Sequence, residues 1–131
     1  MTSHTDLAGL TIMIAEDEAL VAMDLLDLVE HAGGRTIGPC STLAACFAAI
    51  ESTTPSAAIL DVRLGSEEVF PVAEALVDRG VAVVFHSGHA DSEAIRARFP
   101  QSGFCAKPAS ERQIIMALNE ATGETRRIAA E

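Results

Sequence analysis

The segment Leu10–Glu18 reads LTIMIAEDE, an apolar and β-branched run that stops at three consecutive acidic residues. A short continuous apolar run of this kind is typical of a strand buried on both faces of a parallel sheet. The next stretch, Glu18–Ala32, spaces apolar side chains at helical intervals between acidic ones, and Gly33 ends the pattern. The segment therefore predicts a buried strand, an acidic strand end and a helix.

The same alternation of strand and helix patterns continues along the chain. Further strands are predicted at Arg35–Pro39, Ala57–Leu60, Val81–Phe85 and Gly103–Ala106. Further helices are predicted at 41–51, Glu67–Arg79, Asp91–Phe99 and Ser110–Ala121. Short strands that alternate with helices imply a parallel sheet with right-handed crossover connections. We therefore expect an α/β domain of the (βα)5 type, with a five-stranded parallel sheet and helices on both faces.

Length and composition narrow the class of protein. The 131 residues suit one domain, and the apolar fraction of 49% suits a folded one. Nine basic against nineteen acidic residues give a formal charge of −10, which argues against direct DNA binding and against adhesion to membranes. The cysteines Cys40, Cys46 and Cys105 show no paired spacing, and the first residues lack an apolar signal segment. We expect buried cysteines and a cytoplasmic protein.

Polar side chains follow four of the five predicted strands. Glu16 and Asp17 follow the first strand, Asp61 the third, residues 86–88 (HSG) the fourth and Lys107 the fifth. Taken singly, each has an ordinary explanation as a helix cap, a turn or a solvated loop residue. Because sites in open parallel sheets form beyond the carboxyl ends of the strands, their coincidence predicts one site at that edge.

The residue types at this edge favour phosphoryl transfer. Clustered carboxylates repel one another, so they usually raise a pKa or bind a cation. An all-oxygen ligand set suits Mg²⁺. A carboxylate nucleophile, a divalent cation, an ammonium and a hydroxyl together are the groups that would form and neutralise an acyl phosphate.

Taken together, the strand-end motifs resemble those of the receiver domain of bacterial two-component response regulators. They are Glu16-Asp17, Asp61, Ser87-Gly88 and Lys107-Pro108. The resemblance extends over most of the chain and is greatest to stand-alone, single-domain receivers. It implies a flavodoxin-like fold, with an N-terminal extension at 1–9, the receiver domain at 10–122 and a C-terminal tail at 123–131.

The resemblance also implies roles for individual residues. Asp61 would be the phosphorylated residue. Mg²⁺, or Mn²⁺ in its place, would be held by Glu16, Asp17, Asp61 and the backbone carbonyl of Arg63. The phosphoryl group would be stabilised by Ser87 and Lys107.

Further implied roles concern switching and the lifetime of the acyl phosphate. The switch residues would be Ser87 and Phe104, and the Lys107–Pro108 peptide bond would be cis. Arg63 and His89 occupy positions that tune how fast the acyl phosphate hydrolyses.

The sequence departs from the family pattern in two places. Gly65 and Val69 stand where the family usually has Pro and Gly, so the start of the third helix is expected to differ. Phe104 lacks a hydroxyl, so a switch at that position would depend on packing alone.

The implied function is that of a single-domain response regulator in two-component or phosphorelay signalling. Its phosphodonor would be a sensor histidine kinase or a histidine phosphotransfer protein. A downstream protein partner, of unknown identity, would contact the surface of the fourth helix, fifth strand and fifth helix, and a homodimer through this surface stays open. No enzyme activity is expected beyond self-phosphorylation from phosphodonors and auto-dephosphorylation.

Three alternatives remain. A receiver-fold adaptor would have the same fold and work without phosphorylation. A Mg²⁺-dependent phosphohydrolase of the haloacid-dehalogenase type would want a second Asp two residues after Asp61, where Arg63 stands. A flavin protein would want a glycine- and hydroxyl-rich phosphate loop after the first strand, where Glu16 and Asp17 would repel the phosphate.

Overall fold

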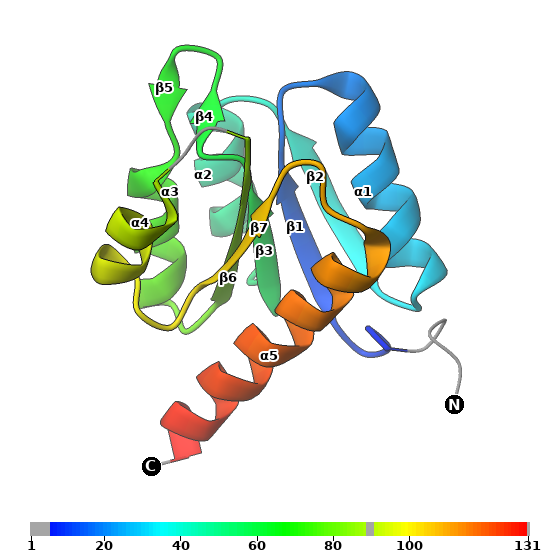
Figure 1. Ribbon diagram of the computed structural model, residues 1–131, viewed down its shortest axis with the longest axis vertical. Helices are drawn as coiled ribbons and strands as arrows, with labels where there is room; N and C mark the ends of the chain where they lie inside the picture. Colours follow the sequence, from blue (N-terminus) through cyan, green and yellow to red (C-terminus); the bar gives the residue numbers. More distant parts are fainter. Residues whose placement is uncertain (1–5, 89–90, 131) are drawn as a thin grey trace.

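The computed structural model describes residues 6–88 and 91–130, which form an α/β fold around a parallel sheet (Figure 1). The five strands lie in the order β2-β1-β3-β6-β7, and all neighbouring strands are parallel. They are β1 (Thr11–Ala15), β2 (Arg35–Cys40), β3 (Ala57–Leu60), β6 (Ala82–Ser87) and β7 (Gly103–Ala106). The predicted flavodoxin-like (βα)5 fold is confirmed.

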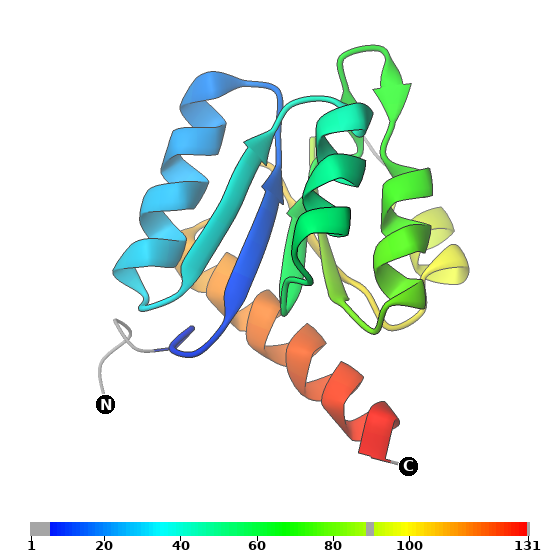
Figure 2. The same cartoon turned by 180° about the vertical axis from the view of Figure 1, so that it is seen from behind.

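Helices cover both faces of the sheet (Figures 1 and 2). They are α1 (Ala19–His31), α2 (Leu43–Ser52), α3 (Phe70–Asp78), α4 (Ser92–Arg98) and α5 (Glu111–Ala130). One core cluster joins the sheet to α2, α3 and α4, and the other joins it to α1 and α5. Among the described residues, no helix has the length and apolar character that a membrane span requires.

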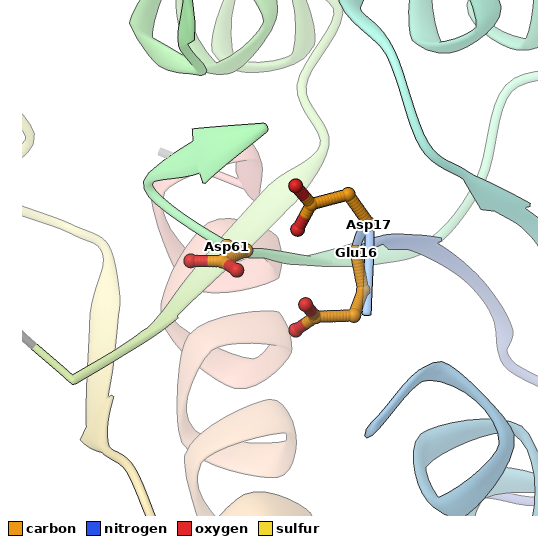
Figure 3. A group of neighbouring side chains, drawn as sticks. All are labelled: Glu16, Asp17 and Asp61. Carbon is orange, nitrogen blue, oxygen red and sulfur yellow. The ribbon is translucent and has the colours of Figure 1, made fainter. Parts of the chain in front are cut away.

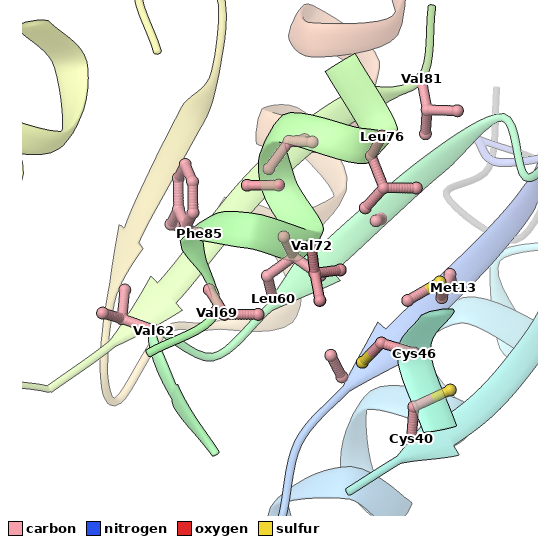
Figure 4. Packing of buried hydrophobic residues seen from close by; sticks show 14 of the residues in the cluster. Met13, Cys40, Cys46, Leu60, Val62, Val69, Val72, Leu76, Val81 and Phe85 are labelled. Atoms are coloured by element: carbon pink, nitrogen blue, oxygen red, sulfur yellow. The ribbon is translucent and has the colours of Figure 1, made fainter. Parts of the chain in front are cut away.

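Strand periodicity decides which side chains enter which core. Along β6, Val83 and Phe85 belong to the cluster on the α2–α4 face, part of which Figure 4 shows, whereas Ala82 and Val84 belong to the cluster on the α1–α5 face. Successive strand residues point to opposite faces, so this alternation is the one expected for a sheet buried on both sides. The three cysteines are free and buried, as their spacing predicted.

The prediction that a helix begins at Glu67 is wrong. Residues Arg63–Leu64 (β4) and Glu67–Glu68 (β5) form a two-stranded antiparallel hairpin, and α3 begins only at Phe70. Gly65 takes φ +63° in the turn, and the buried Leu64 anchors the hairpin to the core. A helical apolar spacing does not reveal such a turn, because glycine supplies the left-handed conformation locally.

Two other elements end more than one residue beyond their predicted last residue. The fourth strand continues past Phe85 to Ser87, because its last residues still pair with β7. Helix α5 continues past Ala121 to Ala130, so the residues predicted as a tail extend the last helix. The added segment contains Gly123 but no proline, and a single glycine weakens a helix without ending it.

Candidate functional site

The strand register brings the predicted site residues to one edge of the sheet. Ala15 pairs with Leu60, so the residues that follow them, Glu16 and Asp61, lie side by side beyond the strand ends. The amide of Asp61 donates to the carbonyl of Ala15 at 2.9 Å. The amide of Lys107 donates to the carbonyl of Ser87 at 3.0 Å, which places the end of β7 at the same edge.

Three carboxylates meet there (Figure 3). One carboxylate oxygen from each of Glu16, Asp17 and Asp61 lies within 4.8 Å of the others. Glu16 is only 1% exposed and Asp61 only 9%, whereas Asp17 is exposed. Two buried carboxylates and one exposed one therefore face a common point from β1 and β3.

A single ammonium group pairs with both buried carboxylates. Nζ of Lys107 lies 3.0 Å from Oε1 of Glu16 and 3.0 Å from Oδ2 of Asp61, with Oε1 of Glu18 at 3.8 Å. Burial by itself lowers the pKa of Lys107, but the hydrogen bonds to Glu16 and Asp61 outweigh burial, so the pKa is raised above its usual range. The ammonium is therefore charged at neutral pH.

Some neighbours of Glu16 raise the pKa of its carboxyl and others lower it. Burial raises the pKa of its carboxyl, and the negative charge of Asp61 acts in the same direction. The hydrogen bonds from Lys107 and from the Glu18 amide oppose this effect. The net pKa is raised, chiefly because the carboxyl is buried and the two hydrogen bonds do not fully compensate for the loss of water.

The β4–β5 hairpin positions the exposed carboxylate. Oδ2 of Asp17 accepts a hydrogen bond from the Gly65 amide at 2.7 Å. The amide of Arg63, at the start of the hairpin, lies 3.5 Å from Oδ1 of Asp61. Sequence reasoning missed the contacts of Glu18 and Gly65 with this site. The Gly-Ser pair at 65–66 is the turn signal that could have indicated the hairpin.

A cleft of about 670 Å³ opens above Asp61. Its lining includes Asp17, Arg63, Ser87 and Lys107. The buried Ser87 thus lines the same space as Asp61, at the edge where the strand ends predicted it.

Three further predictions concern Phe104, the Lys107–Pro108 peptide bond and His89. Phe104 is partly buried and packs against the core on the α2–α4 face. The Lys107–Pro108 peptide bond is cis. His89, predicted to tune the phosphoryl lifetime, lies outside the described residues.

The donor set fits a hard divalent cation. Carboxylate oxygens alone, with one exposed face and room for water, match the preference of Mg²⁺ for a few carboxylates and several waters. Cysteine and histidine, which softer metals prefer, are absent from this carboxylate group. Glu16, Asp17 and Asp61 are therefore the side chains that would hold the ion.

The fold and the acid–lysine cluster together define a receiver domain. SdrG from Sphingomonas melonis Fr1 is 35% identical, with 92% of this chain and 98% of that chain covered and a TM-score of 0.74. The response regulator PhyR from Brucella abortus is 24% identical, with 98% of this chain and 55% of that chain covered and a TM-score of 0.79. A CheY-like receiver domain protein from Methanospirillum hungatei JF-1 is 19% identical, with 92% of this chain and 98% of that chain covered and a TM-score of 0.79. No family model and no curated protein sequence matches the chain.

The chain belongs to the response regulator receiver family. It spans about half the length of the Brucella PhyR chain and nearly all of SdrG. The receiver fold supports a role in response-regulator signalling.

Proposed function

We propose that this receiver accepts a phosphoryl group on Asp61 in a reaction that depends on Mg²⁺ or Mn²⁺. The observation that carries the proposal is the pairing of Asp61 with the Lys107 ammonium, beside two further carboxylates able to hold a cation. The phosphodonor would be the phosphohistidine of a sensor histidine kinase or of a histidine phosphotransfer protein. The setting would be two-component or phosphorelay signalling.

The transfer step uses the carboxylate of Asp61 as nucleophile. A carboxylate oxygen attacks phosphorus, a new bond between that oxygen and phosphorus forms, and the bond from phosphorus to the donor atom breaks. The donor imidazole, or the carboxylate of a small acyl phosphate, leaves with the electron pair. The bound divalent cation would supply charge neutralisation for the phosphoryl oxygens.

Lys107 and Ser87 stabilise the phosphoryl group in this proposal. The raised pKa of Lys107 keeps its ammonium available to pair with a phosphoryl oxygen in place of Asp61 Oδ2. The hydroxyl of Ser87, which lines the same cleft, donates to another phosphoryl oxygen. We propose no enzyme activity beyond this self-phosphorylation and the hydrolysis of the acyl phosphate.

The signalling output would be a change in the conformation of one surface of the domain. Ser87 ends β6, and β6 pairs with β7, so a displacement of Ser87 toward the phosphoryl group acts on the elements that flank it. The affected surface would be that of α4, β7 and α5, with Phe104 adjusting by packing. A downstream protein would read that surface.

The test is rapid-quench mass spectrometry of the protein after incubation with acetyl phosphate and Mg²⁺. We expect a phosphoryl adduct that is absent with a chelator and absent from Asp61→Asn, while the exposed-acid control Asp78→Asn keeps it. Phosphate release is measured in parallel, so that fast hydrolysis does not conceal a reaction. No adduct and no phosphate release would refute the proposal and favour the phosphorylation-independent adaptor.

A further inference from the structure

A second cleft, of about 910 Å³, lies between α1 and the connection from β7 to α5 (both visible in Figure 1). Lys107 lines both this cleft and the Asp61 cleft, and the other lining residues of the two clefts differ. The proposed phosphoryl transfer makes no use of this second cleft.

His86 lines this cleft and is unusual in its environment. Ala82 and Val84 of β6 point into the α1–α5 core, so strand alternation places His86 on the same face. The residue is only 5% exposed, and neither ring nitrogen has a hydrogen-bond partner within residues 6–88 and 91–130. Buried polar atoms without a partner cost free energy, so such an atom calls for an explanation.

The surroundings of His86 favour its neutral imidazole, which can accept a hydrogen bond. Burial lowers the pKa of His86, and the nearby Lys107 charge lowers it further, with Asp61 opposing. A neutral imidazole has one nitrogen that donates and one that accepts. An N–H group that reached the unprotonated ring nitrogen would therefore find an acceptor there.

The walls and rim of the cleft favour a long cationic side chain. Leu25, Leu28 and Ile114 supply an apolar wall against which a methylene stem can lie. Asp24, Asp27 and Glu111 place carboxylates around the same cleft, with His31 at the end of α1 beside them. The positive charge of Lys107 is partly offset by its pairing with Glu16 and Asp61, although its effect at His86 still exceeds that of Asp61.

We propose that this cleft is a docking pocket for an arginine or lysine side chain of a protein partner, with His86 as the hydrogen-bond acceptor at its floor. The negative charge of the three carboxylates around the cleft is complementary to a cationic side chain. Both His86 nitrogens are fully buried, so contact requires a side-chain rearrangement in the cleft wall, of the kind that is common on binding. Because His86 directly precedes Ser87, an occupant of this pocket would also bias the end of β6.

The test titrates the unphosphorylated, ¹⁵N-labelled full chain with N-acetyl-arginine amide, followed by NMR at low salt. The uncharged isostere N-acetyl-citrulline amide serves as the control probe. For one side chain of this size a Kd on the order of millimolar is expected. We expect the arginine probe to shift the His86 ring nitrogens and the amides of 24–28 and 108–114, and the citrulline probe to leave them in place.

Substitutions of the cleft residues test which side chains bind the arginine probe. Asp24→Asn with Asp27→Asn should weaken the arginine probe about three-fold, because exposed ion pairs contribute modestly. His86→Phe should weaken it about ten-fold, since a hydrogen bond to a charged group is lost. The exposed-acid control Asp78→Asn, on α3, should have no effect. Urea unfolding of each variant confirms that it is folded.

Several results would overturn the inference. Equal shifts with the two probes would show an adventitious additive only, and no shifts at a probe concentration several-fold above the expected Kd, with ionic strength matched between the probes, would show no cation pocket. Shifts of these residues with protein concentration alone would identify a second copy of the chain as the occupant. All arms use unphosphorylated protein, so failure here is distinguishable from failure of phosphorylation at Asp61.

Discussion

Lys107 and Asp61 are joined by a 3.0 Å contact between Nζ and Oδ2, although 46 positions separate them in the sequence. The same ammonium bonds Glu16, a further 45 positions away along the chain. One lysine on the β7–α5 connection therefore connects the carboxyl ends of β1 and β3. It neutralises part of the charge that the site accumulates, and this gives it a structural role beside the proposed chemical one.

Replacement of Lys107 should destabilise the fold through Glu16. In Lys107→Met the fully buried Glu16 carboxylate loses its ion-pair partner, and breaking a buried pair in this way costs about 3 kcal/mol. We expect the free energy of unfolding in urea to fall by that amount at pH 7. The double variant Glu16→Gln with Lys107→Met should recover a large part of it.

A surface pair provides the control for this experiment. Glu74 pairs with Arg98 at 3.0 Å, with both side chains at least half exposed. Glu74→Gln should cost less than about 1 kcal/mol, because exposed ion pairs contribute little. A Lys107→Met variant no less stable than Glu74→Gln would contradict the structural role of the lysine.

Asp17 should lower the stability of the metal-free protein and strengthen the binding of Mg²⁺. Its carboxylate shares the cluster with Glu16 and Asp61, so Asp17→Asn removes a repulsion worth about 1 kcal/mol at this exposure. Asn retains an oxygen that accepts the hydrogen bond from Gly65. We therefore expect the variant to be more stable than the native chain in a chelator.

The order should reverse when Mg²⁺ is added. A ligand at a hundred times its Kd stabilises the folded state by about 2.7 kcal/mol, and Asp17→Asn should lose most of that gain. Thermal unfolding with and without Mg²⁺ measures both effects. An equal Mg²⁺ response in the two proteins would exclude Asp17 as a ligand.

Much of the fold could be predicted because each strand is short, apolar and bounded by polar residues. The predicted bounds of Ala57–Leu60 and Gly103–Ala106 match β3 and β7. The strand-end rule then places Glu16, Asp61 and Lys107 at one edge without knowledge of any distance. The structure brings the Lys107 ammonium within hydrogen-bond reach of both carboxylates.

Other features depend on contacts that periodicity does not encode. The β4–β5 hairpin arises because Leu64 is buried and Gly65 adopts a left-handed turn, and the apolar spacing after Glu67 masks it. The bond from Gly65 to Asp17 joins positions 48 apart, so only the folded chain reveals it. His86 reads as a strand-end residue in sequence, and its burial follows from the extension of β6 to Ser87.

Two glycines with positive φ should differ in their tolerance of alanine. Gly65 has φ +63° and open space where a Cβ would lie, so Gly65→Ala should cost about 1 kcal/mol from backbone strain alone. Gly38 has φ +110°, and a Cβ there would lie 2.7 Å from the Ile14 carbonyl oxygen and 2.9 Å from the Cys40 amide nitrogen. Because backbone atoms cannot move aside as a flexible side chain can, Gly38→Ala should lower the free energy of unfolding several-fold more than Gly65→Ala does.

The Gly38 effect should extend to the site. The carbonyl of Cys40 accepts the amide of Glu16 at 3.0 Å, so a shift of this part of β2 moves the first acidic residue. We expect Gly38→Ala to lower both stability in urea and the response to Mg²⁺, whereas Gly65→Ala keeps the Gly65 amide that bonds Asp17. Equal costs for the two variants would show that the β2 end relaxes around a side chain.

His86 should make the fold sensitive to mild acid. Burial holds the pKa of His86 below its usual value of 6.5, so the folded state keeps the imidazole neutral at a pH where the unfolded chain binds a proton. The stability that depends on the neutral form is complete above pH 6.5 and is lost as the pH falls toward the folded-state pKa. Across that window the loss approaches about 1.4 kcal/mol per pH unit.

In His86→Met this contribution is absent, so the free energies of unfolding of the two proteins in urea should converge or cross between pH 7 and pH 5, with that of the variant changing less. Carboxylates titrate in both proteins and largely cancel in the difference, and parallel curves over this range would contradict a lowered pKa of His86 in the folded state.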